Sequence, residues 1–192
     1  EYAYIAIDVG AIGHTIMRVG VEDSTFPWLS NFLSSPETDG IAVTPDSQLV
    51  LSVVPSTNCV QSMESFGDYS VDSGYMCDQM DGARDISVSL QTGVAYVTRP
   101  GLSPTLKTFN TSDMVSGSSH VNTNAPFASA GRVEAVPGEW MRVVVADDDG
   151  RIFLIDTDPD TPPDENWWLL TTLPTAPRGV TVLSLIHISE PT

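Results

Sequence analysis

Four short strand-like segments, followed by a restart of the same pattern, occupy residues 132–182. RVEAV, EWMRVVVA, RIFLID and WWLLTTL alternate with turn-forming stretches, and PRGVTV then opens a new copy of the first segment. Four antiparallel strands that repeat in this way are typical of one blade of a β-propeller. An equivalent apolar residue occurs at positions 41, 86, 133 and 180, with spacings of 45, 47 and 47 residues. We therefore predict an all-β chain: a β-propeller fragment, or partial ring, of about four blades with four antiparallel strands each.

The repeat divides the chain into blades near residues 1–38, 39–83, 84–131 and 132–177, with residues 178–182 starting the next blade. The blades are not uniform. Residues 56–83 are rich in Ser, Asp, Gly and Met, and we expect a long, irregular surface excursion with weak strands there. In the first blade, residues 26–33 are expected to form the fourth strand. In the third blade, a polar Ser/Asn stretch stands where the fourth strand is expected.

The repeat starts and stops inside a blade, whereas closed propellers contain about four to eight complete blades. We therefore expect residues 1–182 to be a fragment of a longer propeller. The final segment, 183–192 (LSLIHISEPT), breaks the repeat. It resembles one translated frame of a transposase adapter used in sequencing libraries, so we expect a tail that is not part of the fold. The alternative is a natural strand of a fifth blade.

The chain is strongly acidic, with 25 Asp and Glu against 8 Lys and Arg and a net charge of −17. Such a surface repels nucleic acid and anionic membranes, so neither is expected as a partner. No run of 18 or more apolar residues is present, which predicts no membrane span. A saline habitat, cation binding or an ordinary extracellular surface would each be consistent with the charge.

Cys59 and Cys77 are the two cysteines of the chain, and both fall within the expected excursion. A disulfide between them would stabilise a loop that lacks a core of its own, by about 3 kcal/mol in the chain-entropy description. Disulfides persist in oxidising compartments, so this pairing predicts an extracellular or periplasmic location. The alternative is a pair of unrelated free thiols.

No catalytic motif is found in the sequence: GxSxG, HExxH, GxGxxG and P-loop patterns do not occur. His14 and His120 have no ligand-type neighbours at metal-binding spacing and are expected to be surface or structurally satisfied histidines. Asp156, Asp158 and Asp160 have the spacing that opens a calcium loop. However, Thr161 stands where Gly is required and Trp167 where Glu is required, so we expect a solvated acidic loop rather than a metal site.

Arg84, Arg132 and Arg178 lie at the entrances of predicted first strands. Because first strands line the central channel of a propeller, these side chains are expected near one mouth of it. Converging guanidinium groups would bind a carboxylate or phosphate ligand. The alternative is that each arginine bonds a neighbouring blade.

The segments IAVTPDSQLVLSV, GVAYVTR, VVVADDDGRIFLIDTD and LPTAPRGVTV resemble the YVTN-type β-propeller repeat. Tyr96, Val97 and Thr98 match its Y-V-T sequence, with Arg99 in place of Asn. The resemblance implies a fold shared by lactonase-like, quinoprotein-like and cell-surface propellers. We expect a binding or interaction scaffold with an unknown protein or small anionic ligand. The alternative is a lactonase-like or quinoprotein-like enzyme acting on a small anionic substrate in the channel.

Overall fold

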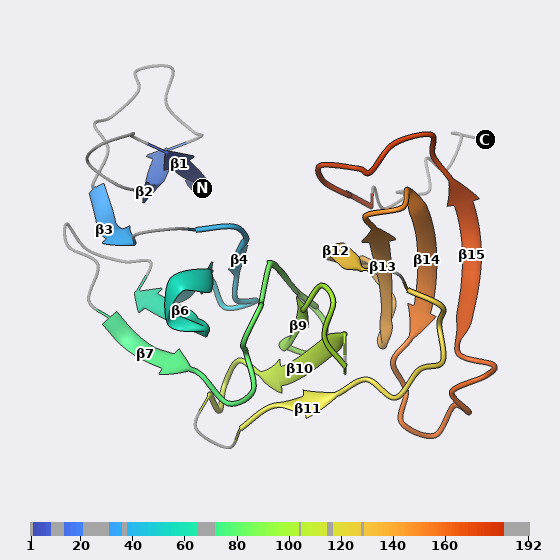
Figure 1. Cartoon of the computed structure of the whole chain (residues 1–192). Helices are drawn as coiled ribbons and strands as arrows, with labels where there is room; N and C mark the ends of the chain where they lie inside the picture. The colour runs from blue at the N-terminus through green and yellow to red at the C-terminus, as the bar shows by residue number, and fades with distance from the viewer. Residues whose placement is uncertain are drawn as a thin grey trace, which may run out of the picture.

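The computed structural model describes residues 2–8, 14–20, 31–35, 38–64, 72–103, 105–114, 117–127 and 129–182. Within these ranges the regular structure is β-strand, apart from one short 3-10 turn at Pro55–Thr57 (η2). The strands form four antiparallel sheets that follow one another along the chain (Figure 1). The predicted all-β architecture is confirmed. The expected tail, 183–192, lies outside the described residues.

Each sheet is a meander in which every strand pairs with the next one along the chain. The first sheet contains β1 (Tyr2–Asp8), β2 (His14–Gly20) and β3 (Asn31–Ser35). The second contains β4 (Ile41–Val43), β5 (Leu49–Val54), β6 (Cys59–Glu64) and β7 (Asp72–Met76). The third contains β8 (Asp85–Val88), β9 (Val94–Thr98), β10 (Leu106–Asn110) and β11 (Ser119–His120). The fourth contains β12 (Ala130–Ala135), β13 (Arg142–Asp147), β14 (Arg151–Asp156) and β15 (Trp167–Thr172).

The hairpin between β13 and β14 shows why these segments become strands. In β13, Val143 and Val145 belong to a core cluster, and Val144 between them is also buried because strands in the middle of a sheet are covered on both faces. The turn that follows closes with a hydrogen bond of 3.0 Å from the Gly150 amide to the Asp147 carbonyl. Gly150 has φ +85°, which glycine adopts without steric cost. An apolar run and a glycine turn together fix this hairpin.

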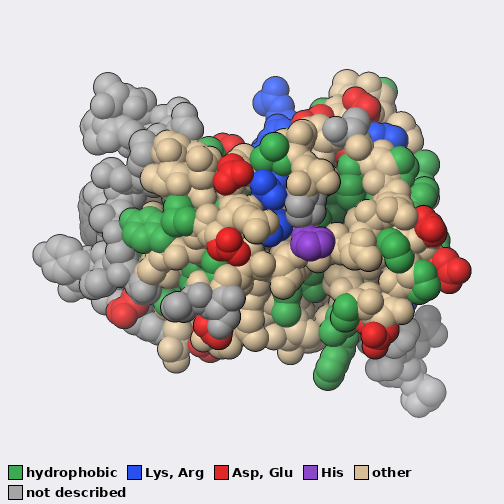
Figure 2. Space-filling view, turned by 60° about the horizontal axis from the view of Figure 1, so that its bottom comes forward, with side chains coloured by type: hydrophobic (Ala, Val, Ile, Leu, Met, Phe, Trp, Pro, Cys, Tyr) green, Lys and Arg blue, Asp and Glu red, His purple; other side chains and the backbone are tan. Residues whose placement is uncertain are grey.

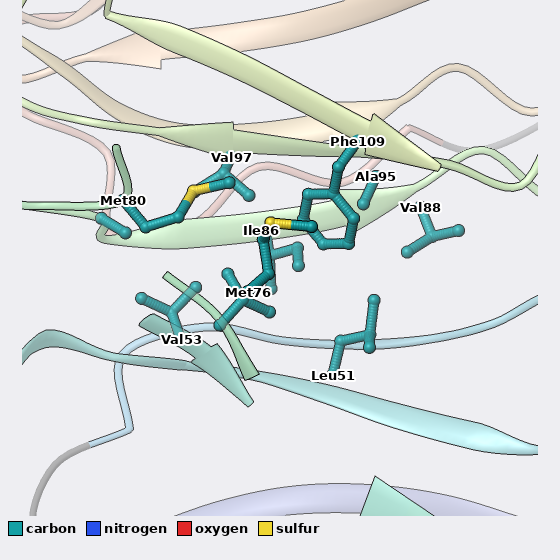
Figure 3. Close-up of a cluster of buried hydrophobic side chains, with 11 residues drawn as sticks. Leu51, Val53, Met76, Met80, Ile86, Val88, Ala95, Val97 and Phe109 are labelled. Atoms are coloured by element: carbon teal, nitrogen blue, oxygen red, sulfur yellow. The ribbon is translucent and has the colours of Figure 1, made fainter. Parts of the chain in front are cut away.

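Apolar side chains fill the spaces between neighbouring sheets. Leu51 and Val53 of the second sheet face Val97 and Phe109 of the third, as Figure 3 shows. A second cluster joins the third sheet to the fourth through Tyr96, Leu106, Val133, Val145 and Phe153. From the second sheet to the fourth, the described core is therefore a series of layers between consecutive sheets.

The first strands of the sheets lie side by side, with β8 adjacent to both β4 and β12. The approach between β4 and β8 is close at Gly40. A Cβ atom at Gly40 would lie 2.8 Å from the Asp85 Cα and 2.9 Å from the Ile86 amide nitrogen. This spacing leaves no room for a side chain at residue 40.

The expected irregular excursion at 56–83 is wrong for much of its length. β6 pairs with β5 at every position from Cys59 to Glu64, and all of its residues except Glu64 are buried. This strand could not be recognised from the sequence, because Gln61 and Ser62 are polar and their burial depends on the neighbouring strands. The structure also places β7 here, where glycine and serine give weak strand propensity.

The last strand of the first sheet differs in its bounds from the expected segment, and the last strand of the third sheet is short. β3 begins at Asn31, whereas residues 26–33 were expected, and 21–30 lie outside the described residues. β11 contains only Ser119 and His120, in keeping with the polar composition of this stretch. Among the described residues, no helix is long and apolar enough to cross a membrane.

Candidate functional site

The first strands of the third and fourth sheets are joined by side chains rather than by a backbone ladder. The Val133 amide donates a 3.0 Å hydrogen bond to Asp85 Oδ2, and the Ala135 amide donates one of 3.0 Å to Ser87 Oγ. Ser87 Oγ in turn donates to Glu134 Oε2 at 3.2 Å. Two carboxyl groups therefore lie along the seam between β8 and β12.

Burial changes the acidity of both carboxyl groups. Desolvation raises the pKa of Asp85, although the Val133 amide and the nearby Arg132 and Arg84 act in the opposite direction. Desolvation also raises the pKa of Glu134, opposed by its hydrogen bond from Ser87. The seam is a partly desolvated polar strip, in which ionisation of a carboxyl group costs more free energy than on the open surface.

The structure brings two of the three predicted arginines to this seam. Arg84 and Arg132 both lie close enough to Asp85 to affect its pKa. Arg84 Nη1 bonds both carboxylate oxygens of Asp148 at 2.9 Å. The Nε atom of Arg132 is buried and has no hydrogen-bond partner among the described residues. Arg178 is exposed and makes no hydrogen bond or ion pair with the part of the chain that the structure describes.

Two adjoining hollows form a single groove across the junction of the second and third sheets. Their volumes are about 490 and 340 Å³, and they share Leu49, Thr111 and Ser112 as lining residues. The β4–β5 turn, the β8–β9 turn, the loop after β10 and the end of β7 form the walls. Tyr75 and Leu90 line this groove and remain 49% and 63% exposed. The groove thus has a mixed lining, in which exposed Tyr75 and Leu90 lie beside polar groups such as Asp46, Asp78 and Ser112.

A disulfide between Cys59 and Cys77 fixes one wall of the groove. It joins the start of β6 to the residue that follows β7, as predicted from the sequence. Cys77 and its neighbour Asp78 both line the groove. Asp78 Oδ2 accepts hydrogen bonds from the amide and hydroxyl groups of Ser118, at 3.1 and 3.3 Å. This wall is therefore anchored to the second sheet by a covalent bond and to the third sheet by hydrogen bonds.

Two cationic side chains hold the loop that follows the disulfide. Lys107 is 1% exposed, and its Nζ donates a 3.0 Å hydrogen bond to Gln79 Oε1. Burial lowers the pKa of Lys107. Arg99 is 5% exposed and donates from Nε to the Asp81 carbonyl at 2.9 Å. Figure 2 shows Lys and Arg side chains gathered in the middle of one face of this acidic molecule, with Asp and Glu scattered around them.

Acidic residues near the groove serve local turns. Asp46 Oδ1 accepts hydrogen bonds of 2.6 Å from Thr44 Oγ1 and 3.0 Å from the Gln48 amide. The bond from Thr44, followed by that from Gln48, lowers the pKa of Asp46. The β4–β5 turn therefore presents a carboxylate at the edge of the groove.

The three aspartates of the candidate calcium segment also stabilise turns. Asp156 Oδ1 accepts from the Asp158 amide at 3.0 Å, and Asp158 Oδ1 accepts from the Asp160 amide at 2.9 Å. Among the described residues, no group of three or more His, Cys, Asp or Glu side chains is arranged to hold a metal ion.

No protein family matches this chain, and no curated protein sequence matches it. Solved structures do. The WD40 repeats of RRP9 superpose with a TM-score of 0.58 at 14% identity, over 88% of this chain and 47% of that one. WD40 repeats form propeller blades of four strands. The fold is a β-propeller.

Two further solved structures agree with this assignment. Nidogen, in a complex with laminin, gives a TM-score of 0.70 at 13% identity, over 93% of this chain and 65% of that one. Hydrazine synthase of Kuenenia stuttgartiensis gives 0.58 at 16% identity, over 74% of this chain and 40% of that one. The chain spans 40 to 65% of the length of these three structures. At such low identities, the likeness concerns the fold alone.

Sequence reasoning identified the disulfide and two residues of the β8–β12 seam, but it missed the groove. The groove is assembled from turns of different sheets, such as the β4–β5 turn with Asp46 and the β8–β9 turn with Gln91. One signal was available: the turns TPDSQ and LQTG occupy equivalent places in consecutive repeats. Equivalent turns of adjacent blades lie side by side, so a shared surface could have been anticipated there.

Proposed function

We propose that this chain belongs to an extracellular or periplasmic β-propeller of the YVTN type that binds a partner protein. The observation that carries the proposal is the groove between the second and third sheets, where exposed Tyr75 and Leu90 lie in a mixed lining of apolar and polar residues. Aromatic and aliphatic anchors surrounded by polar groups are characteristic of protein-recognition surfaces.

The disulfide supports both the location and the binding role. A bond between Cys59 and Cys77 persists in an oxidising compartment. It also limits the movement of the groove wall, and a preorganised surface loses less entropy on binding. The nidogen structure offers a parallel, because that protein was solved in a complex with laminin.

The charge of the groove favours a particular kind of partner. Asp46 and Asp78 place carboxylates along it, on a chain with a net charge of −17. Electrostatic complementarity accelerates the association of oppositely charged surfaces and disfavours partners of like charge. We therefore infer a partner segment that carries Lys or Arg beside an apolar side chain.

Selection of peptides from a random display library on the immobilised chain tests this proposal. We expect enriched peptides to combine basic and apolar residues, and to lose about tenfold in affinity, or 1.4 kcal/mol, for Tyr75→Ala or Leu90→Ala. Leu170→Ala is the matched control, because Leu170 is 54% exposed on β15 and does not line the groove. Peptides that bind both groove variants as tightly as the parent would contradict the proposal.

A second candidate function is binding of a small anionic ligand at the β8–β12 seam, as in a lactonase-like or quinoprotein-like enzyme. The buried, unpartnered Nε of Arg132 favours it, because a carboxylate or phosphate would satisfy that donor. Calorimetric titration with acetate, citrate and phosphate tests it. Heat of binding that disappears in Arg132→Ala and persists in Arg178→Ala would support this site, and no heat with any anion would reject it.

A further inference from the structure

A separate hollow lies beside the loop after β9, the end of β11 and the segment that leads to β12. Its volume is about 420 Å³, and it shares no lining residue with the groove or with the β8–β12 seam. Its polar lining consists of neutral hydroxyl and amide groups and one imidazole, contributed by Ser103, Thr105, His120, Asn122, Thr123 and Asn124. Among the residues that the structure describes, no Asp, Glu, Lys or Arg lines this hollow, although the chain carries a net charge of −17.

The outer wall of the hollow is held in place by the loop between β14 and β15. The Asn124 amide donates a 3.0 Å hydrogen bond to the Pro163 carbonyl. Asn166, which is 1% exposed, donates from Nδ2 to the Asn122 carbonyl at 2.9 Å and accepts from Thr123 Oγ1 at 2.8 Å. These contacts join residues about 40 positions apart in sequence. The wall is therefore held by tertiary contacts of the protein itself and is preformed without a ligand.

Apolar side chains complete the lining. Leu106 and Val121 are buried in the core between the third and fourth sheets. Phe127 also lines the hollow and is half-buried, and its ring packs edge-on against Phe153 with a centroid distance of 5.2 Å. The site therefore presents one fixed aromatic ring among neutral polar groups.

Three polar side chains of the lining have unused hydrogen-bonding capacity. The Ser103 hydroxyl, the His120 imidazole and the Asn122 side-chain amide make no hydrogen bond with any residue that the structure describes. Each of these groups can both donate and accept a hydrogen bond. They come from two segments, the loop after β9 and the end of β11 with the residues that follow it, and they meet at one hollow.

We propose that this hollow binds a neutral saccharide unit. Sugar hydroxyls both donate and accept, which matches the lining groups, and the C–H face of a sugar ring suits an aromatic side chain such as Phe127. The volume of 420 Å³ lies within the range of about 300–1,000 Å³ for small-molecule sites. An anionic ligand fits less well, because no Lys or Arg is among the described residues that line the hollow.

Saturation-transfer NMR with the full chain tests this proposal, using glucose, galactose, mannose and N-acetylglucosamine one at a time. We expect signal transfer to at least one sugar, and a decrease of at least about fivefold in affinity for Asn122→Ala, because each lost hydrogen bond contributes about 1 kcal/mol. Ser103→Ala is a second variant, since Ser103 is exposed and its replacement leaves the core intact. Asn110→Ala, in the groove, is the matched control and should leave sugar binding unchanged.

Two outcomes would overturn the proposal. One is the absence of transfer to all four sugars. The other is transfer that Asn122→Ala and Ser103→Ala leave unchanged, which would place the sugar elsewhere. A parallel titration with sodium sulfate, monitored through the His120 ring resonances, distinguishes an anion-binding site from a sugar-binding site. Sulfate binding without sugar binding would also overturn the proposal. Peptide binding at the groove depends on Tyr75 and Leu90, so its success or failure is measured independently.

Discussion

Arg84 and Asp148 connect the third sheet to the fourth: the Nη1 atom of Arg84 lies 2.9 Å from both carboxylate oxygens of Asp148. Arg84 immediately precedes β8, and Asp148 immediately follows β13, 64 residues later. Asp148 Oδ2 also accepts a 2.8 Å hydrogen bond from Ser129 Oγ. The Asp148 carboxylate therefore connects the start of β8 in the third sheet with the residue that precedes β12 in the fourth sheet.

A double-mutant cycle with Arg84→Ala and Asp148→Ala measures this connection. The two side chains are 36% and 37% exposed, so we expect solvent to screen the pair and the coupling to be about 0.5–1 kcal/mol. Urea unfolding followed by tryptophan fluorescence gives the four free energies of unfolding. Strictly additive single effects would mean that the ion pair contributes nothing to stability.

The close approach of β4 and β8 predicts that Gly40→Ala destabilises the protein. The new Cβ would lie within 3 Å of the Asp85 backbone, and overpacking of this kind costs about 1–3 kcal/mol. Gly179→Ala is the control: a Cβ there has no neighbour within 4 Å, and we expect a change of at most about 0.5 kcal/mol. Thermal unfolding should separate the two variants, and equal melting temperatures would be inconsistent with the observed spacing.

Removal of the disulfide by Cys59→Ser and Cys77→Ser together is expected to lower the free energy of unfolding by about 3 kcal/mol, because the bond closes a sequence separation of 18 residues. Dithiothreitol should lower the denaturation midpoint of the parent to that of the double variant. The same reagent should not change the double variant itself. A parent that is insensitive to reduction would refute the stabilising role.

The raised pKa values of Asp85 and Glu134 predict how the free energy of unfolding depends on pH. Burial raises the pKa of both groups, so the folded state binds their protons more readily than the unfolded state does. Their contribution to stability therefore falls as the pH rises from the ordinary carboxyl range through the raised values. Asp85→Asn and Glu134→Gln abolish this titration and keep an acceptor oxygen. Relative to the parent, we expect both variants to gain stability as the pH rises above the ordinary carboxyl range.

Asp46 provides the control of opposite sign. Hydrogen bonds from Thr44 and Gln48 lower its pKa, so its contribution to stability is present at neutral pH and is lost as the pH falls. The deficit of Asp46→Asn relative to the parent should therefore grow as the pH rises. Chemical denaturation at a series of pH values measures all three variants. An Asp85→Asn curve parallel to that of the parent would contradict the assignment.

Local features of the sequence were sufficient for much of the fold. The VVVA run of β13, the glycine turn at Gly150 and the apolar run of β14 are local signals, and each produced the expected strand or hairpin. The prediction failed at β6, where Gln61 and Ser62 are buried. Their burial depends on β5 on one side and β7 on the other, and a polar segment carries no local sign of such neighbours.

The repeat of 45 to 47 residues by itself determined the all-β class and the four-stranded unit, because strand propensity and turn chemistry act over a few residues. Tertiary structure alone decided what lies between the sheets. It paired Arg84 with Asp148, left Arg178 exposed, joined equivalent turns into a groove and brought Ser103 and Asn122 to one hollow. These contacts join residues that are far apart along the chain, and they arise only when apolar faces of neighbouring sheets pack together and bury their common core.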